Sequence, residues 1–235
     1  MSLARCSALL GFVMFVGSTT TARATTIFFG DVVSGTGDIT TGPIGATSPL
    51  QNSGLTCGPH PAATNLAICD MVFSTLVISG APTAAANGSY TPLNLYEQYN
   101  ANTNTLTMYG SIQGCASCSN LPGFVSATTL LTIVFSSNLT ANATVSSATI
   151  NPFPVVNSVT INPTLLLDLG ETGPFVLTTF SAGGNADSSV GGNYRTTFGS
   201  LMLSSGVPEP GSAALLGLGL AAAIIARRVS KHHPV

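Results

Sequence analysis

Charged side chains are scarce in this chain of 235 residues, since Asp, Glu, Lys and Arg make up 6% of it, against about 25% in an average soluble domain. With only six Lys and Arg residues, the chain lacks the basic surface that nucleic-acid binding requires, so we expect no nucleic-acid partner. The same scarcity excludes a charge-rich disordered chain. The interior also has no run of about 18 uncharged apolar residues, which excludes a multi-span transporter.

The first 24 residues have the pattern of a secretory signal peptide. Arg5 supplies a positive charge, Ala8 to Val16 form a short apolar run, and Ala22 and Ala24 are small residues of the kind that a signal peptidase requires. We therefore expect signal peptidase to remove residues 1–24. The alternative is an N-terminal anchor or a buried helix, although the apolar run is short for a bilayer.

The C-terminus has three consecutive features. Val207, Pro208, Glu209 and Pro210 precede an apolar stretch at 211–226, and a basic cluster of Arg227, Arg228 and Lys231 follows. As a helix, the sixteen apolar residues would span about 24 Å, short of the ~30 Å hydrocarbon core, but flanking basic side chains can extend the span. We predict a transmembrane helix at 211–226 with a cytoplasmic C-terminus. The two prolines favour extended backbone around Glu209, as a protease substrate needs.

Together these three features resemble the PEP-CTERM sorting signal of Gram-negative bacteria. The resemblance covers about residues 207–231 and extends to no other part of the chain. It implies recognition by an exosortase, a membrane cysteine protease, and export linked to exopolysaccharide and biofilm. The alternative is a plain single-span anchor. The arrangement is analogous to a GPI signal, whose hydrophobic tail is discarded.

Between the two ends lies a body of residues 25–206 that is acidic and free of lysine. Arg195 is its only Lys or Arg residue against seven carboxylates, which gives a net charge of −6. Such a surface disfavours nucleic acid and anionic lipid, and it tolerates neutral polysaccharide or divalent cations. We predict three segments: a signal peptide at 1–24, an extracytoplasmic domain at 25–206 and the sorting signal at 207–235.

The body has the pattern of an all-β domain. Apolar residues alternate with polar ones in 105–112 and 129–135, and further strands are expected near 26–33, 66–79, 93–99, 144–150, 156–161, 174–181 and 195–203. No stretch of the body has a sustained helical period. We predict one antiparallel β-sandwich or jelly roll, with a hairpin loop at 100–104, a longer loop starting at Gly183, and a surface loop over 34–65.

Four cysteines remain in the body after the signal peptide is removed, an even number that favours disulfides in an exported chain. We expect pairs that close short local loops, Cys57 with Cys69 and Cys115 with Cys118. Pairing between the two groups, a redox role for Cys115 and Cys118, and a zinc site are the alternatives. No thioredoxin-like pattern surrounds the redox candidate, and the spacing of the first pair is not that of a zinc knuckle.

Catalytic residues are not evident. His60 is the only histidine of the body, it lies between two prolines, and the chain has no G-x-S-x-G motif. Asp168 and Glu171 are candidates for a glycosidase pair, but they lie three residues apart beside glycines, in a body without Trp. We expect a solvated turn there and predict that the protein is not an enzyme.

Two ligand hypotheses remain. Asp38 lies in a Gly-rich segment, and Asp187 follows Gly183 and Gly184; oxygen ligands of this kind suit Ca²⁺, but neither segment repeats, so a turn is the simpler interpretation and we expect no cofactor. Tyr96 and Tyr109 flank the expected hairpin, where they would be cross-strand neighbours and could contact a glycan.

The sequence therefore predicts an exported, non-enzymatic protein of the cell surface or extracellular matrix. Its expected partners are signal peptidase, an exosortase and extracellular polysaccharide, and it would pass through the inner membrane as a single-span intermediate. The alternative function is a carbohydrate-binding or adhesive β-sandwich. A glycan hydrolase is the third hypothesis.

Overall fold

The computed structural model describes residues 24–53, 65–90, 92–112, 128–187 and 192–206. The predicted signal peptide, membrane helix and sorting residues lie outside them, and no helix among the described residues is long and apolar enough to cross a membrane. Every strand pairing in this part of the chain is antiparallel, and all strands join in one 13-stranded sheet. The prediction of an all-β antiparallel fold is confirmed.

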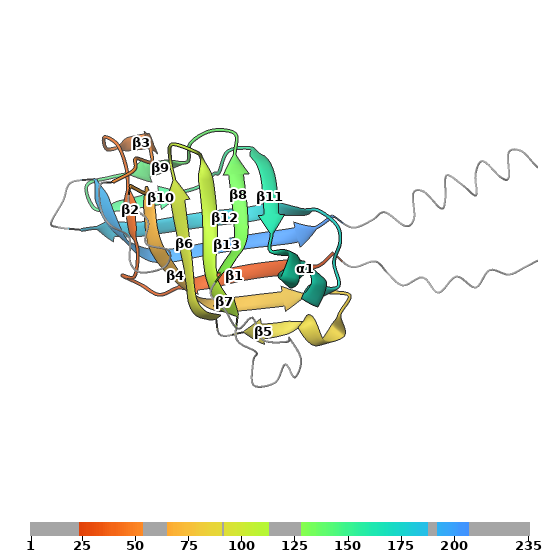
Figure 1. The fold of residues 1–235 in the computed structure, drawn as a ribbon. Coiled ribbons are helices and arrows are strands. Elements are labelled where there is room, and N and C mark those ends of the chain that lie inside the picture. The colour runs from red at the N-terminus through yellow and green to blue at the C-terminus, as the bar shows by residue number, and fades with distance from the viewer. Residues whose placement is uncertain (1–23, 54–64, 91, 113–127, 188–191, 207–235) are drawn as a thin grey trace, which may run out of the picture. The chain divides into compact units, whose positions relative to one another are not determined.

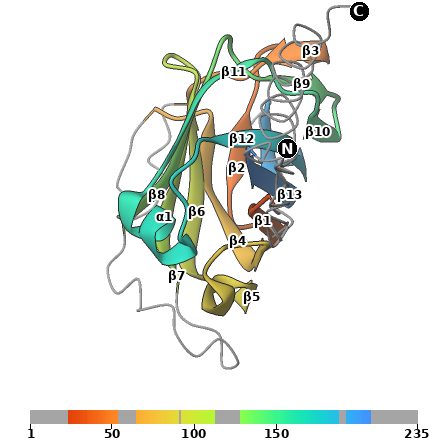
Figure 2. The same cartoon turned by 90° about the vertical axis from the view of Figure 1, so that its right-hand side faces the viewer.

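The sheet folds over so that its two halves face each other, with strand directions that cross steeply (Figure 1). One half consists of β6 (Pro92–Asn100), β7 (Thr105–Ile112), β8 (Thr128–Phe135) and β11 (Val156–Ile161). The other half contains β1 (Thr26–Val32), β12 (Phe175–Ala186) and β13 (Asn193–Ser205). Figure 2 shows the two layers from the side.

A single long strand, β4 (Ile68–Ser79), belongs to both layers. Its first residues pair with β6, and from Phe73 onward it pairs with β1. Asp70 lies at an irregularity in the β4–β6 register and has a positive φ of 44°, which is uncommon for a residue other than glycine. Bends of this kind are how a strand passes from one layer to the next in steeply crossed sheets.

Short strands complete the sheet beyond and beside these layers. Beyond β12 lie β10 (Ser147–Ile150), β9 (Thr140–Ala143) and β3 (Gly45–Pro49), while β2 (Asp38–Thr40) bridges β13 and β4, and β5 (Gly88–Tyr90) pairs with β4. The prediction of a loop over 34–65 was therefore wrong at β2 and β3. These strands are too short, and too rich in Gly, Pro and Thr, to produce a visible alternation.

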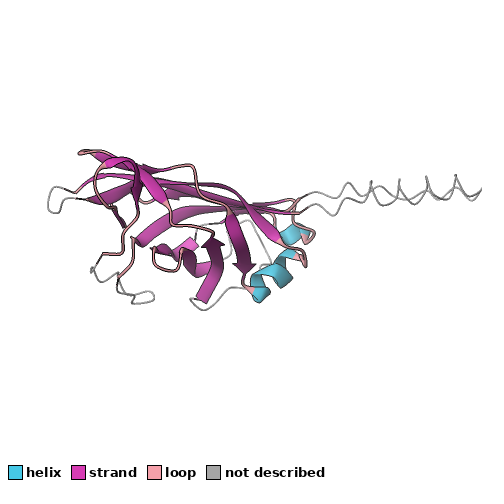
Figure 3. Ribbon diagram, turned by 90° about the horizontal axis from the view of Figure 1, so that it is seen from above, coloured by secondary structure: helices cyan, strands magenta, loops and turns pink. Residues whose placement is uncertain are grey.

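Helical structure is confined to two short segments in the described residues, which lie at one end of the strands (Figure 3). These are a 3-10 turn, η1 (Ala84–Ala86), and α1 (Pro163–Leu169). The sequence, in which no stretch of the body has a sustained helical period, did not predict α1. Seven residues make only two turns, too few for a 3.6-residue period to emerge, but Asn162 caps the helix, Pro163 opens it and Gly170 ends it in the left-handed conformation.

The core fills the space between the two layers. The inward residues of β8, which are Leu131, Ile133 and Phe135, are each at most 1% exposed, as the alternation predicts. Phe135 contacts Phe180 of β12 across the layers, with ring centroids 6.3 Å apart, and Tyr99 of β6 at 6.2 Å. This apolar interior fixes the positions of the polar outer faces and of the strand ends. Most of the candidate sites lie on these outer faces and strand ends.

Candidate functional site

A charge cluster forms where β2, β13 and the end of β12 meet. Arg195 projects from β13, and its Nε lies 3.4 Å from Asp38 Oδ1 and 3.3 Å from Asp187 Oδ2. Asp38 pairs directly with Arg195 in the β2–β13 register. The sequence singled out both aspartates separately for Ca²⁺, and the fold brings them together on the body's one arginine.

The electrostatics of this cluster favour the guanidinium as its cation. Burial raises the pKa of Asp38, the Arg195 charge lowers it, and the nearby Asp187 carboxylate raises it. Arg195 Nη1 also donates to the Gly35 carbonyl at 3.4 Å. The described residues contain no group of three side chains suited to hold a metal ion. The guanidinium therefore occupies the position between the Asp38 and Asp187 carboxylates that a divalent cation would need in order to bind both.

The residues that begin the predicted loop at Gly183 belong instead to β12, so that prediction was wrong. A Cβ on Gly184 would lie 2.2 Å from the Arg195 carbonyl oxygen, and one on Gly183 would lie 2.4 Å from the Phe198 ring. Glycine is required there because β12 and β13 approach closely. The Gly-Gly segment looks like a turn in the sequence because the close approach of β13, which requires glycine there, leaves no local pattern.

Tyr96 and Tyr109 are cross-strand partners, as predicted. The hairpin between β6 and β7 also spans the predicted residues 100–104. Leu95 and Tyr99 are fully buried and face the core, so Tyr96 lies on the outer face of the layer, where both tyrosines are half-buried. In the same register Thr107 lies opposite both Gln98 and Thr132. The outer face therefore combines two neighbouring phenol rings with threonine hydroxyls, while the Gln98 amide is only 5% exposed and donates to Asp70 Oδ1 at 2.7 Å.

On the opposite face of β6, Glu97 is fully buried, with 0% of its surface exposed. It lies between Met71 of β4 and Met108 of β7, and neither carboxylate oxygen has a hydrogen-bond partner. Burial raises its pKa to about 8. Sequence reasoning gave this residue no role, yet the signal was present, because Glu97 shares the inward face of β6 with Leu95.

Asp168 and Glu171 have separate environments. Asp168 lies on α1, and burial raises its pKa. Glu171 follows the helix, and its Oε1 accepts hydrogen bonds from the hydroxyls of Thr25 and Ser205. The expectation of a solvated turn was therefore wrong for Glu171, since this carboxylate joins the beginning of β1 to the end of β13.

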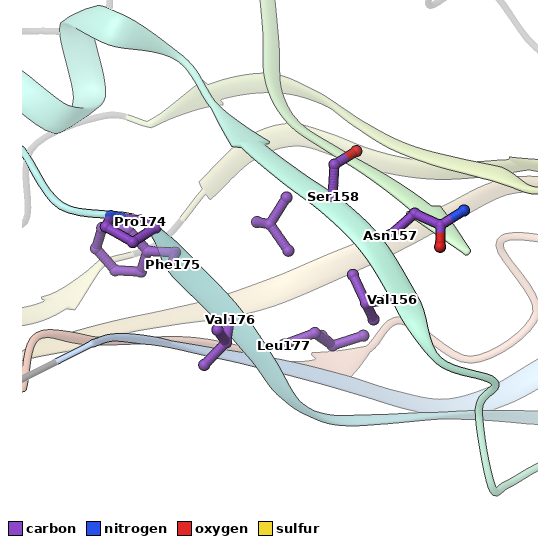
Figure 4. Close-up of a pocket in the computed structure, with 8 residues that line it drawn as sticks. Val156, Asn157, Ser158, Pro174, Phe175, Val176 and Leu177 are labelled. Carbon is purple, nitrogen blue, oxygen red and sulfur yellow. The ribbon is translucent and has the colours of Figure 1, made fainter. Parts of the chain in front are cut away.

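A groove of about 360 Å³ separates β11 from β12, where the folded sheet does not close on itself (Figure 4). The side chains around it are mostly apolar, namely Val156, Val159, Pro174, Phe175, Val176 and Leu177. Asn157 and Ser158 are its polar members. It contains no titratable side chain and so offers no acid–base chemistry.

Several predicted residues lie outside the described part of the chain. These are His60, Cys57, Cys115 and Cys118, and the sorting residues Val207, Pro208, Glu209, Pro210, Arg227 and Arg228. Cys69 is described, on β4, and is 7% exposed. The disulfide pairings stay predictions.

Comparison with known proteins bears on the C-terminus. Residues 206–229 match the family model for the PEP-CTERM protein-sorting motif. No curated protein and no solved structure matches the chain. The match begins at Gly206, one residue after the last residue of β13. The chain therefore carries a PEP-CTERM protein-sorting motif that directly follows its β-sheet body.

Proposed function

We propose that this protein is an exported, non-enzymatic component of the cell surface or extracellular matrix, which an exosortase sorts through its C-terminal motif. The motif match at 206–229 carries the proposal. Sorting would end with removal of the tail near Pro208 to Pro210, after signal peptidase has removed residues 1–24.

The position of the motif supports this order of events. All the strands of the described residues lie between Thr26 and Ser205, so cleavage near Pro208 would remove none of them. The amide of Gly206 donates to the Pro174 carbonyl at 3.2 Å, which ties the end of β13 to the sheet just before the motif. A folded body that ends there could be released whole.

The experiment is to express the full chain in a Gram-negative host with and without an exosortase. A variant with Pro208, Glu209 and Pro210 each changed to Ala serves as the comparison, and a variant with Pro82→Ala, on the body surface, is the matched control. We expect intact-mass measurement to show loss of the tail only in the exosortase host and not in the triple variant. Identical masses and locations for all forms would exclude sorting by this motif.

A second candidate function is glycan binding by the outer face of β6 and β7. The cross-strand pairing of Tyr96 with Tyr109 favours it, because two adjacent rings beside threonine hydroxyls can stack on a sugar and hydrogen-bond to it. We expect saturable binding on a glycan array that is lost on Tyr96→Ala or Tyr109→Ala and kept on Phe198→Ala, an exposed aromatic of β13. Binding that survives both tyrosine changes would exclude this face.

A further inference from the structure

Glu171 lies at the point where the two ends of the body meet. Its Oε1 accepts from Thr25 Oγ1 and, at 3.4 Å, from Ser205 Oγ. The backbone N–H of Thr25 donates to Ser205 Oγ at 2.8 Å, and the Ser205 N–H donates to the Thr25 carbonyl at 2.8 Å. Thr25 is 0% exposed and Ser205 is 5% exposed. We call these three residues the terminal clasp.

Among the described residues, the clasp has a negative charge and no cation. Arg195 is the only Lys or Arg residue of the body, and it is bound to Asp38 and Asp187. Every hydrogen bond that the structure gives Glu171 at its side chain comes from a neutral hydroxyl. A half-buried carboxylate in a body of charge −6 would be stabilised by an opposite charge within about 4–6 Å.

We propose that Glu171 is the counter-ion of the mature amino-terminus. This rests on the proposed function, because removal of residues 1–24 makes Thr25 the first residue. Water hydrolyses the Ala24–Thr25 peptide bond, its hydroxyl goes to the Ala24 carbonyl carbon, and the Thr25 nitrogen becomes a free amine that takes up a proton near neutral pH. The positive charge then forms inside the clasp.

The existing contacts already place this nitrogen beside the carboxylate. The Thr25 nitrogen and Glu171 Oε1 share Ser205 Oγ as a hydrogen-bond partner, and the Thr25 hydroxyl bonds directly to Oε1. An ammonium has three N–H donors in place of one, so it can keep the bond to Ser205 and turn a further donor toward Glu171. Signal-peptide removal would thus complete an ion pair between the Thr25 amine and Glu171.

The test uses the body 25–206, which contains all the described strands, prepared with a free Thr25 amine and with an acetylated one. The pKa of the free amine is measured by NMR in the unchanged chain and in Glu171→Gln, whose amide can still accept from both hydroxyls. Asp31→Asn, an exposed carboxylate on β1, is the matched control. The intact mass of the protein from cells reports its first residue.

We expect the amine pKa to lie at least half a unit above its ordinary value of about 7.7–8.0, to fall back in Glu171→Gln and to stay raised in Asp31→Asn. Glu171→Gln should also lower the melting temperature more in the free-amine form than in the acetylated form. An unraised amine pKa, or equal losses in both forms, would overturn the ion pair. A mature chain that does not begin at Thr25 would overturn the proposal at its premise and leave export and sorting unaffected.

Discussion

Glu97 is the residue whose ionisation bears most directly on stability. Its pKa is raised from 4.5 to about 8 by burial, so between these values the folded state keeps a proton that the unfolded state has released. Raising the pH over this range therefore lowers the free energy of unfolding, by up to about 1.4 kcal/mol per pH unit. We expect urea unfolding to show this decline from pH 5 to 8.

The variant Glu97→Gln isolates the cause of that decline. Its amide has nearly the same shape as the carboxyl group and does not ionise, so the free energy of unfolding should change less with pH than in the unchanged protein. An equal pH dependence in the two proteins would show that other groups are responsible.

At Arg195 we predict a switch in the response to calcium. The variant Arg195→Met removes the guanidinium and leaves Asp38 and Asp187 facing each other. It should lower the free energy of unfolding by about 1 kcal/mol at most, because the arginine side chain is 53% exposed and ion pairs at the surface contribute little. Millimolar Ca²⁺ should then raise the melting temperature of the variant and leave that of the unchanged protein alone. Calorimetry measures both.

The control for this prediction adds Asp38→Asn to Arg195→Met, which removes one of the two carboxylates. The calcium response should disappear in this double variant. A calcium response in the unchanged protein would instead mean that the guanidinium does not take the place of the ion.

At the scale of elements, the close contact of β12 with β13 depends on Gly184. Ala at this position would place its Cβ 2.2 Å from the backbone oxygen of Arg195, which has no flexible end that can move aside. We expect Gly184→Ala to lower the free energy of unfolding by about 2 kcal/mol or more. Gly173→Ala, where nothing lies within 4 Å, should have little effect, and similar losses at both sites in urea unfolding would contradict the explanation.

The short helix α1 depends on its cap. Asn162 Oδ1 accepts from the Thr164 N–H at 2.9 Å, and Asn162 Nδ2 donates to the Thr129 carbonyl of β8 at 3.1 Å. Asn162→Ala should lower the free energy of unfolding by about 1 kcal/mol. Asn157→Ala, an exposed position on β11, is the control, and an equal loss there would show that the cap contributes nothing particular.

The elements that sequence could predict are those with their signal in consecutive residues. Alternation located β8 and β7, and the turn residues located the hairpin that pairs Tyr96 with Tyr109. Strands β2 and β3 gave no such signal, since each is held by pairing with strands far away in the chain. Gly184 looks like a loop residue for a different reason, since only its close approach to β13, the next strand of the chain, requires glycine there.

At the scale of the whole molecule, sequence predicted the class of fold but not the single sheet that folds over on itself. That arrangement depends on β4 serving both layers and on β1 lying between β4 and β13, and no local pattern encodes these pairings. The candidate sites divide in the same way. The sorting motif is contiguous and was predicted from its residues, and the family match confirms it. The Arg195 cluster and the terminal clasp join residues from opposite ends of the body, so they were not predicted.

One mechanical consequence follows from the position of β13. The tail follows this strand, so in the proposed membrane-held precursor a pull on the tail would reach the body through Ser205. Strand β13 pairs with β12 along most of its length and with β1 and β2 on its other edge. Drawing it out of the sheet would load both of these hydrogen-bond ladders in shear at once, so the two ladders together would resist tension on the proposed tether.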